Sequence, residues 1–161
     1  MRNPYKIEGP ALISFSGGRT SGFMLKQIVD AHDGVLPEDV HITFANTGKE
    51  MPETLDFVKD CGEHWGIDIT WLELEIGDEK PIYRTKIVDY DSASRNGEPF
   101  SALLDRRAYL PNPVARFCTA EMKIRRMKEF MWKIKGYKYW DNILGLRYDE
   151  PKRVISSRNA S

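Results

Sequence analysis

The fold of this chain is best predicted from one segment, Ser14-Phe15-Ser16-Gly17-Gly18-Arg19-Thr20-Ser21-Gly22. It follows the apolar run Ala11-Leu12-Ile13 and precedes residues 20–29, which are expected to form a helix. The predicted order is therefore strand, glycine turn and helix N-terminus. This order favours an anion site, because the first helical turn leaves backbone N–H groups without partners and the helix dipole attracts negative charge.

The residue types in this segment also suit a phosphate. Gly17 and Gly18 lack a Cβ, so an anion can come close to the backbone. Hydroxyl groups and a fixed positive charge are supplied by Ser16, Thr20, Ser21 and Arg19. The spacing differs from that of the Walker loop and of the Gly-x-Gly-x-x-Gly loop. An ordinary strand-to-helix turn capped by Thr20 or Ser21 explains the same residues, and spacing alone does not separate the two interpretations.

The composition bounds the class of protein. With 161 residues, the chain is expected to form a single domain over residues 1–155, followed by a frayed polar tail over residues 156–161. No apolar run reaches the roughly 18 residues that span a membrane, and the first residues lack the apolar core of a signal peptide. A cytoplasmic protein with no membrane partner is therefore predicted.

The cysteine and histidine content argues against a resident metal. Two cysteines, Cys61 and Cys118, exclude a four-cysteine iron–sulfur or zinc site within the chain. Cys61 falls on the apolar face of a predicted helix and is expected in the core. The three histidines have no partner at metal-ligand spacing, so no metal site is predicted.

The net charge of zero is unevenly distributed along the chain. Residues 1–105 carry 10 basic and 19 acidic side chains, a net charge of −9, whereas residues 106–161 carry 14 basic and 5 acidic side chains, a net charge of +9. This asymmetry favours a polyanionic partner for the second part, either a nucleotide with several phosphates or a nucleic-acid acceptor. Mutual neutralisation of the two parts within one domain explains it equally well.

Apolar runs alternate with amphipathic stretches. Strands are expected over residues 11–15, 40–45, 67–74 and 140–146, and residues 82–90 are either strand or loop. Helices are expected over residues 20–29, 52–65, 99–107 and 119–134, the last with Met122, Arg126, Phe130 and Ile134 on one stripe. The alternation predicts an α/β fold of Rossmann-like type, with a mostly parallel sheet and helices on both faces.

Three further segments are expected at the edge of the sheet where the glycine turn lies, because parallel strands share a carboxyl edge and ligands bind there. The first is Asn46-Thr47-Gly48-Lys49-Glu50-Met51-Pro52-Glu53-Thr54, after the second strand. The next is Arg116-Phe117-Cys118-Thr119-Ala120-Glu121-Met122-Lys123, where two cations bracket a helix start. The last is Gly145-Leu146-Arg147-Tyr148-Asp149-Glu150-Pro151-Lys152-Arg153. Arg125, Arg126 and Lys128 are interpreted as a solvated helix face.

Together the four segments resemble the phosphoadenosine phosphosulfate (PAPS) reductase family of the adenine-nucleotide alpha-hydrolase superfamily, which includes the PP-loop ATP pyrophosphatases. The family patterns are Ser-Gly-Gly-x-x-Ser, Asp-Thr-Gly-x-x-x-Pro-Glu-Thr, Arg-x-Cys-Thr-x-x-x-Lys and Gly-x-Arg-x-x-Glu-x-x-Arg, and they occur here in the family order. Asn46 stands where the family frequently has Asp. Residues 93–100, Ala-Ser-Arg-Asn-Gly-Glu-Pro-Phe, are similar to a PAPS-reductase-like branch of bacterial and phage proteins.

The resemblance implies an adenine nucleotide, PAPS or ATP, as ligand. The implied nucleotide-binding residues are Ser14, Ser16, Gly17, Gly18, Arg19, Thr20, Ser21, Asn46, Thr47, Gly48, Arg116, Lys123, Gly145, Arg147 and Arg153. Cys118 is the candidate thiol nucleophile, since Arg116 and a helix start favour a thiolate. A small residue packed beside the ligand is the simpler interpretation of Cys118.

The chain departs from the family in ways that leave its reaction open. Family members that use thioredoxin carry a catalytic cysteine in a C-terminal Glu-Cys-Gly-Leu-His segment, and residues 154–161 contain no such segment. In the glycine loop, Arg19-Thr20 replaces the Lys-Asp pair that is common in the family. One expected reaction is thiol-dependent reduction of PAPS, with a thioredoxin-like reductant as partner. Another is cleavage of ATP between its α and β phosphates to adenylate an acceptor for thiolation or amidation, with Mg²⁺ on the phosphates. A binding module without catalysis and a homo-oligomer are further alternatives.

Overall fold

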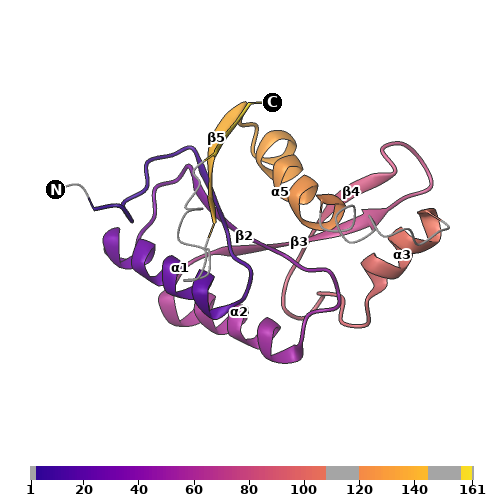
Figure 1. The fold of residues 1–161 in the computed structure, drawn as a ribbon, viewed down its shortest axis with the longest axis horizontal. Coiled ribbons are helices and arrows are strands. Elements are labelled where there is room, and N and C mark those ends of the chain that lie inside the picture. The colour runs from indigo at the N-terminus through magenta and orange to yellow at the C-terminus, as the bar shows by residue number, and fades with distance from the viewer. Residues whose placement is uncertain (1–2, 108–119, 145–156, 161) are drawn as a thin grey trace.

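The computed structural model of the chain describes residues 3–107, 120–144 and 157–160 (Figure 1). They form a sheet in the order β4-β3-β2-β1-β5-β6. Its strands are β1 (Ala11–Ser14), β2 (Val40–Ala45), β3 (Ile69–Ile76), β4 (Tyr83–Val88), β5 (Tyr139–Leu144) and β6 (Ser157–Ala160). The four inner strands β3, β2, β1 and β5 are parallel, and the outer strands β4 and β6 are antiparallel to their neighbours.

Helices cover both faces of the sheet, as Figure 1 shows. They are α1 (Arg19–Ala31), α2 (Pro52–Trp65), α3 (Glu98–Arg107) and a helical stretch made of η1 (Ala120–Ile124), α5 (Arg125–Glu129) and η2 (Phe130–Ile134). The segments η1 and η2 are π-helical turns. The predicted mostly parallel α/β sheet with helices on both faces is therefore confirmed.

Alternation along β1 explains the two-sided core. Ala11 and Ile13 belong to an apolar cluster with residues of α1 and α2, whereas Leu12 packs with Phe130 and Trp140 on the other face. Successive side chains of a strand point to opposite faces, so an uninterrupted apolar run requires cover on both sides. A buried parallel strand therefore dictates the three-layer arrangement.

Local signals set the ends of α2. Pro52 occupies the first turn, where its missing N–H costs nothing, and Gly66 ends the helix in the left-handed conformation at φ 62°. The predicted bounds of α2 and of β2 match the structure. Residues 82–90, expected as strand or loop, contain β4, and residues 157–160, expected in a frayed tail, form β6 beside β5.

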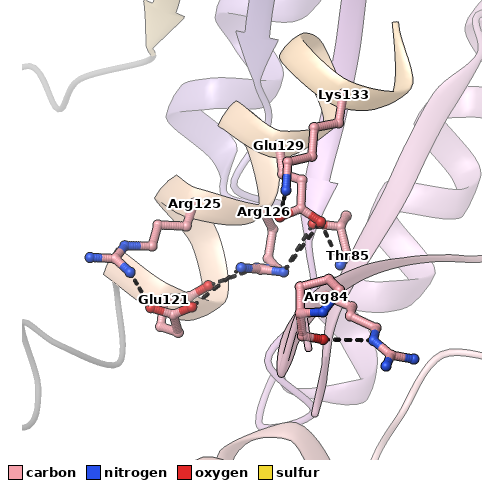
Figure 2. A network of polar contacts seen from close by, with 8 residues as sticks. Arg84, Thr85, Glu121, Arg125, Arg126, Glu129 and Lys133 are labelled. Carbon is pink, nitrogen blue, oxygen red and sulfur yellow. Dashed lines mark hydrogen bonds and ion pairs between the residues drawn. The ribbon is translucent and has the colours of Figure 1, made fainter. Parts of the chain in front are cut away.

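The prediction that Arg126 lies on a solvated helix face is wrong. Arg126 is 2% exposed; its Nε donates to the Glu121 backbone O at 3.0 Å, and its Nη1 donates to Thr85 Oγ1 at 3.0 Å. Figure 2 shows the guanidinium between Glu121 and Glu129. Its Nη2 lies 3.3 Å from Glu121 Oε1, and its Nη1 lies 3.9 Å from Glu129 Oε1. The Glu121 carboxylate is 1% exposed and is costly to bury unless it is paired. Its two cationic partners are the buried Arg126 and the exposed Arg125, whose Nη1 lies 3.1 Å from Glu121 Oε2.

The same ionic cluster docks the helical stretch onto the edge strand. Glu129 Oε1 accepts the backbone N–H of Thr85 in β4 at 3.1 Å. Ile134 was expected on one stripe with Met122 and Phe130, which are buried, but it is 46% exposed. The π-helical turns change the angular step between residues, so a stripe predicted from α-helical spacing drifts away from the core.

Among the described helices, none combines the length and the apolar character that crossing a bilayer would require.

We predict that Arg126→Ala lowers the free energy of unfolding by up to about 3–5 kcal/mol, because it leaves the buried Glu121 carboxylate with only the exposed Arg125, 3.1 Å away, as a cation. Lys128→Ala removes an exposed cation from the same helix and should change stability by less than about 0.5 kcal/mol. Urea unfolding monitored by tryptophan fluorescence measures both. Equal stability of the two variants would contradict the structural role of the Arg126 cluster.

Candidate functional site

The parallel pairing of β1 and β2 brings two loops together at the carboxyl edge of the sheet. Ser14 is in register with Thr43, and the N–H of Phe15 donates to the Thr43 backbone O at 2.8 Å. We call residues 15–18, between β1 and α1, the first loop, and residues 46–51, between β2 and α2, the second loop. Ligands of open parallel sheets bind beyond this edge, so the two loops form the candidate site.

Hydroxyl groups hold the first loop in shape. Ser21 is 2% exposed, and its Oγ accepts the N–H of Ser16 at 3.2 Å and lies 2.8 Å from Ser16 Oγ. Ser16 Oγ in turn accepts the N–H of Gly18 at 3.3 Å. The buried Ser21 therefore holds the loop from its inner side, whereas Ser16 and Gly18 are exposed at its surface.

The two glycines of the first loop have different roles. Gly17 adopts φ +80°, and a Cβ there would lie 2.6 Å from Thr54 Cγ2 of α2. Gly18 is the N-cap of α1 in an extended conformation, and a Cβ there would find Ser16 Oγ, its nearest neighbour, at 3.5 Å. Position 17 thus requires glycine, both for its positive φ and for its close approach to Thr54. Gly18 instead leaves open space over the first turn of α1.

Within the described part of the chain, the N-terminus of α1 has neither a side chain that caps it by a hydrogen bond nor an acidic residue in its first turn. The alternative in which Thr20 or Ser21 caps the helix does not hold, because Gly18 occupies the N-cap position. Arg19 and Thr20 are exposed on the first turn, beside the N–H groups that a helix start leaves unpaired.

Internal hydrogen bonds hold the second loop. Asn46 is fully buried; its Oδ1 accepts the N–H of Gly48 at 3.2 Å, and its Nδ2 donates to Glu73 Oε2 at 2.8 Å. Thr47 Oγ1 donates to Glu50 Oε1 at 3.2 Å and accepts the N–H of Lys49. Asn46 is therefore placed beneath the loop, where it orients backbone groups.

The structure brings Lys123 to the second loop. Its Nζ lies 4.0 Å from Glu50 Oε1, and its side chain is 41% exposed. Ser14, by contrast, donates from Oγ to Met127 Sδ at 3.2 Å, so it faces α5. Five other predicted site residues lie outside the described residues: Arg116, Cys118, Gly145, Arg147 and Arg153.

Sequence reasoning missed the buried neighbours of the second loop. Glu73 of β3 is 3% exposed and contacts Asn46, and Ser94 contacts both of them. The only signals were a single acidic residue inside the apolar run Trp71-Leu72-Glu73-Leu74 and the similarity of residues 93–100 to phage and bacterial proteins.

Other candidate groups do not belong to this edge. Cys61 is buried on α2, and burial, assisted by Asp60, raises its pKa to about 11, so the thiol is protonated at neutral pH. Burial and the nearby Lys135 lower the pKa of His41, which contacts Tyr137. Among the described residues, no three His, Cys, Asp or Glu side chains are grouped as metal ligands.

A cavity of about 620 Å³ lies at the other end of β3. Its walls include Gly62 and Glu63 of α2, Ile69 at the start of β3 and Asp89 just after β4. This position is at the amino end of the parallel strands, whereas the first and second loops lie at the carboxyl end. The cavity is therefore separate from the candidate site.

We predict that Gly17→Ala lowers the free energy of unfolding by about 2–4 kcal/mol, from strain at positive φ and from overpacking against Thr54. Gly18→Ala is the matched control and should cost below about 1 kcal/mol, the loss of a good N-cap residue. Thermal and urea unfolding of both variants provide the comparison. A Gly17→Ala protein as stable as Gly18→Ala would contradict the assigned loop geometry.

Comparison with known proteins matches most of the chain to one family. Residues 10–158 match the model of the phosphoadenosine phosphosulfate reductase domain. The chain is 31% identical over 147 residues to the uncharacterized nin region protein ORF290 of Escherichia phage lambda; the match covers 89% of this chain and 50% of the phage protein. It is also 38% identical over 76 residues to an uncharacterized protein of Methanocaldococcus jannaschii, covering 47% of this chain and 15% of that protein.

The chain therefore spans half the length, or less, of these curated relatives. The family supports a nucleotide-related function. Because the family model covers β1 to β5 in full and reaches into β6, the fold and the match describe the same unit. The chain belongs to the phosphoadenosine phosphosulfate reductase domain family, within the adenine-nucleotide alpha-hydrolase superfamily.

Proposed function

We propose that this protein binds an adenine nucleotide, PAPS or ATP, at the carboxyl edge of β1 and β2 and acts at its phosphate or sulfate end. The observation that carries the proposal is the uncapped N-terminus of α1 behind the first loop. Backbone N–H groups and the helix dipole offer a phosphate several donors there. Gly18 leaves the approach open, and Ser16 adds a hydroxyl.

Cations from other elements complete the proposed phosphate site. Lys123 reaches the second loop from η1, where Glu50 is its partner at 4.0 Å. A phosphate is a stronger partner than a partly buried carboxylate at that distance, so Lys123 is proposed to turn to the ligand. The family resemblance adds Arg116, Arg147 and Arg153 as further proposed phosphate ligands.

Two reactions fit such a site. In the first, the sulfonate of PAPS is reduced by two electrons; a dithiol is oxidised to a disulfide, and sulfite and adenosine bisphosphate are released. In the second, an acceptor oxygen attacks the α phosphorus of ATP, and pyrophosphate leaves. Mg²⁺ bound to the phosphate oxygens would neutralise charge in the second reaction, with few protein ligands needed.

The cysteines bear on the first reaction. Cys61 is buried with its pKa raised to about 11, so little of it is the thiolate that acts as nucleophile. Thiol chemistry within this chain is therefore assigned to Cys118, which the family resemblance places beside Arg116. The ATP reaction needs no thiol, and for that reason it is kept as the second candidate.

We predict that Lys123→Ala weakens binding of ATP or of adenosine bisphosphate by about ten- to a hundredfold, the effect of losing one charged hydrogen bond to a phosphate. Lys128→Ala, an exposed lysine on α5, should bind within about twofold of the natural protein. Calorimetric titration of both variants measures the difference. Absence of binding of either nucleotide, or of PAPS, to the natural protein would overturn the proposed function.

Product analysis separates the two reactions. Sulfite released from PAPS with reduced thioredoxin would assign the reductase reaction, and loss of this activity in Cys118→Ser with retained binding would assign the thiol. Pyrophosphate released from ATP, unchanged in Cys118→Ser, would assign the second reaction. Binding with no turnover of either nucleotide would identify a binding module.

A further inference from the structure

We propose that Glu73 is a positioning residue of the nucleotide site, which joins the second loop to the segment of residues 93–100. The proposal rests on the proposed function of this edge, because Glu73 would act on the ligand only through the second loop. The proposal also gives residues 93–100 a role, because through Glu73 they would hold the second loop in place.

Glu73 connects two segments of the chain through hydrogen bonds. The residue lies in β3 and is 3% exposed. Its Oε2 accepts Asn46 Nδ2 at 2.8 Å and the N–H of Ser94 at 2.6 Å, and its Oε1 accepts Ser94 Oγ at 2.8 Å. These donors are uncharged and come from two segments 48 residues apart. A buried carboxylate is costly unless it is hydrogen-bonded, so displacing either segment carries a penalty.

Asn46 transmits this constraint to the backbone of the second loop. Its Nδ2 donates to Glu73 and also to the Ser94 backbone O at 2.9 Å, and its Oδ1 accepts the N–H of Gly48 at 3.2 Å. The amide group therefore fixes Gly48 relative to β3 and to residue 94 simultaneously. An aspartate at position 46 would place two carboxylates against each other and remove both donated hydrogen bonds.

A second contact locks the two segments together. The N–H of Gly97 donates to the Gly48 backbone O at 2.9 Å. A Cβ on Gly48 would lie 3.0 Å from Pro99 Cδ and 3.1 Å from Gly97 backbone atoms. There is no room for a side chain between position 48 and residues 97–99, so the Gly48 backbone packs against these residues and its position depends on where they are held. Glu73 holds them by accepting both donors of Ser94.

Calorimetric titration with ATP or adenosine bisphosphate tests the proposal, with folding followed in parallel by thermal unfolding. Glu73→Ala is expected to weaken binding about tenfold, as expected when one hydrogen bond to the ligand is misplaced. Glu73→Gln should bind within about twofold, because its Oε1 can accept from Asn46 and the Ser94 N–H while its Nε2 donates to Ser94 Oγ. Asn46→Asp should bind about tenfold more weakly, and Asn46→Asp combined with Glu73→Gln should recover part of the loss.

Leu72→Ala distinguishes positioning from general stability. Leu72 is the preceding residue of β3, fully buried on the opposite face with Phe130 and Met131. Its removal should lower the unfolding temperature at least as much as Glu73→Ala while leaving affinity within about twofold. Ser94→Ala, which removes one hydrogen bond from a half-buried side chain, should fold and should weaken binding in the direction of Glu73→Ala.

The outcomes separate this proposal from the one on which it rests. If the natural protein binds none of the nucleotides, the proposed function fails, and the positioning role fails with it. If the natural protein binds, but Glu73→Ala loses no more affinity than Leu72→Ala, the positioning role alone is overturned. If Glu73→Gln binds as weakly as Glu73→Ala, hydrogen bonding through this side chain is not what positions the loop.

Discussion

The parallel pairing of β1 with β2 is the constraint on which the rest of this structure depends. The register from Ala11 opposite Val40 to Ser14 opposite Thr43 ends both strands at the same level. The first and second loops must then emerge side by side, and α1 and α2 must return along the same face. A shift by one residue would turn Leu12 and Ile13 toward the wrong layers and separate the two loops.

Two buried polar clusters connect the outer elements to this frame, and each serves a different part of the molecule. Arg126 and Glu121 attach the helical stretch of residues 120–134 to β4, and that stretch carries Lys123 toward the second loop. Glu73 and Asn46 attach residues 93–100 to the second loop itself. Buried polar groups demand fixed partners, so these clusters specify geometry more sharply than apolar contacts do.

Much of the fold was predictable because its signals are local. Pro52 and Gly66 mark the ends of α2, and the apolar run at residues 40–45 marks β2. The neighbourhood of the two loops followed from the rule that parallel strands share a carboxyl edge. The stripe shared with Met122 and Phe130 was a signal for the burial of Arg126, but the buried partner Glu121 and the π-helical turns that bring the two together were not predictable. The partners of Glu73 are likewise set by a contact between residues 21 positions apart.

The hydrogen bond from the Thr85 backbone to Glu129 has a consequence for how this molecule meets others. The outer strand of a sheet is a template on which a foreign strand can assemble, and proteins protect such strands with charges. In β4 a carboxylate already occupies one of the backbone donors, and Arg126 and Lys133 surround it with further charge. Strand addition along β4 would have to displace this ionic cover, so the cluster that docks the helix also guards the sheet against edge-to-edge aggregation.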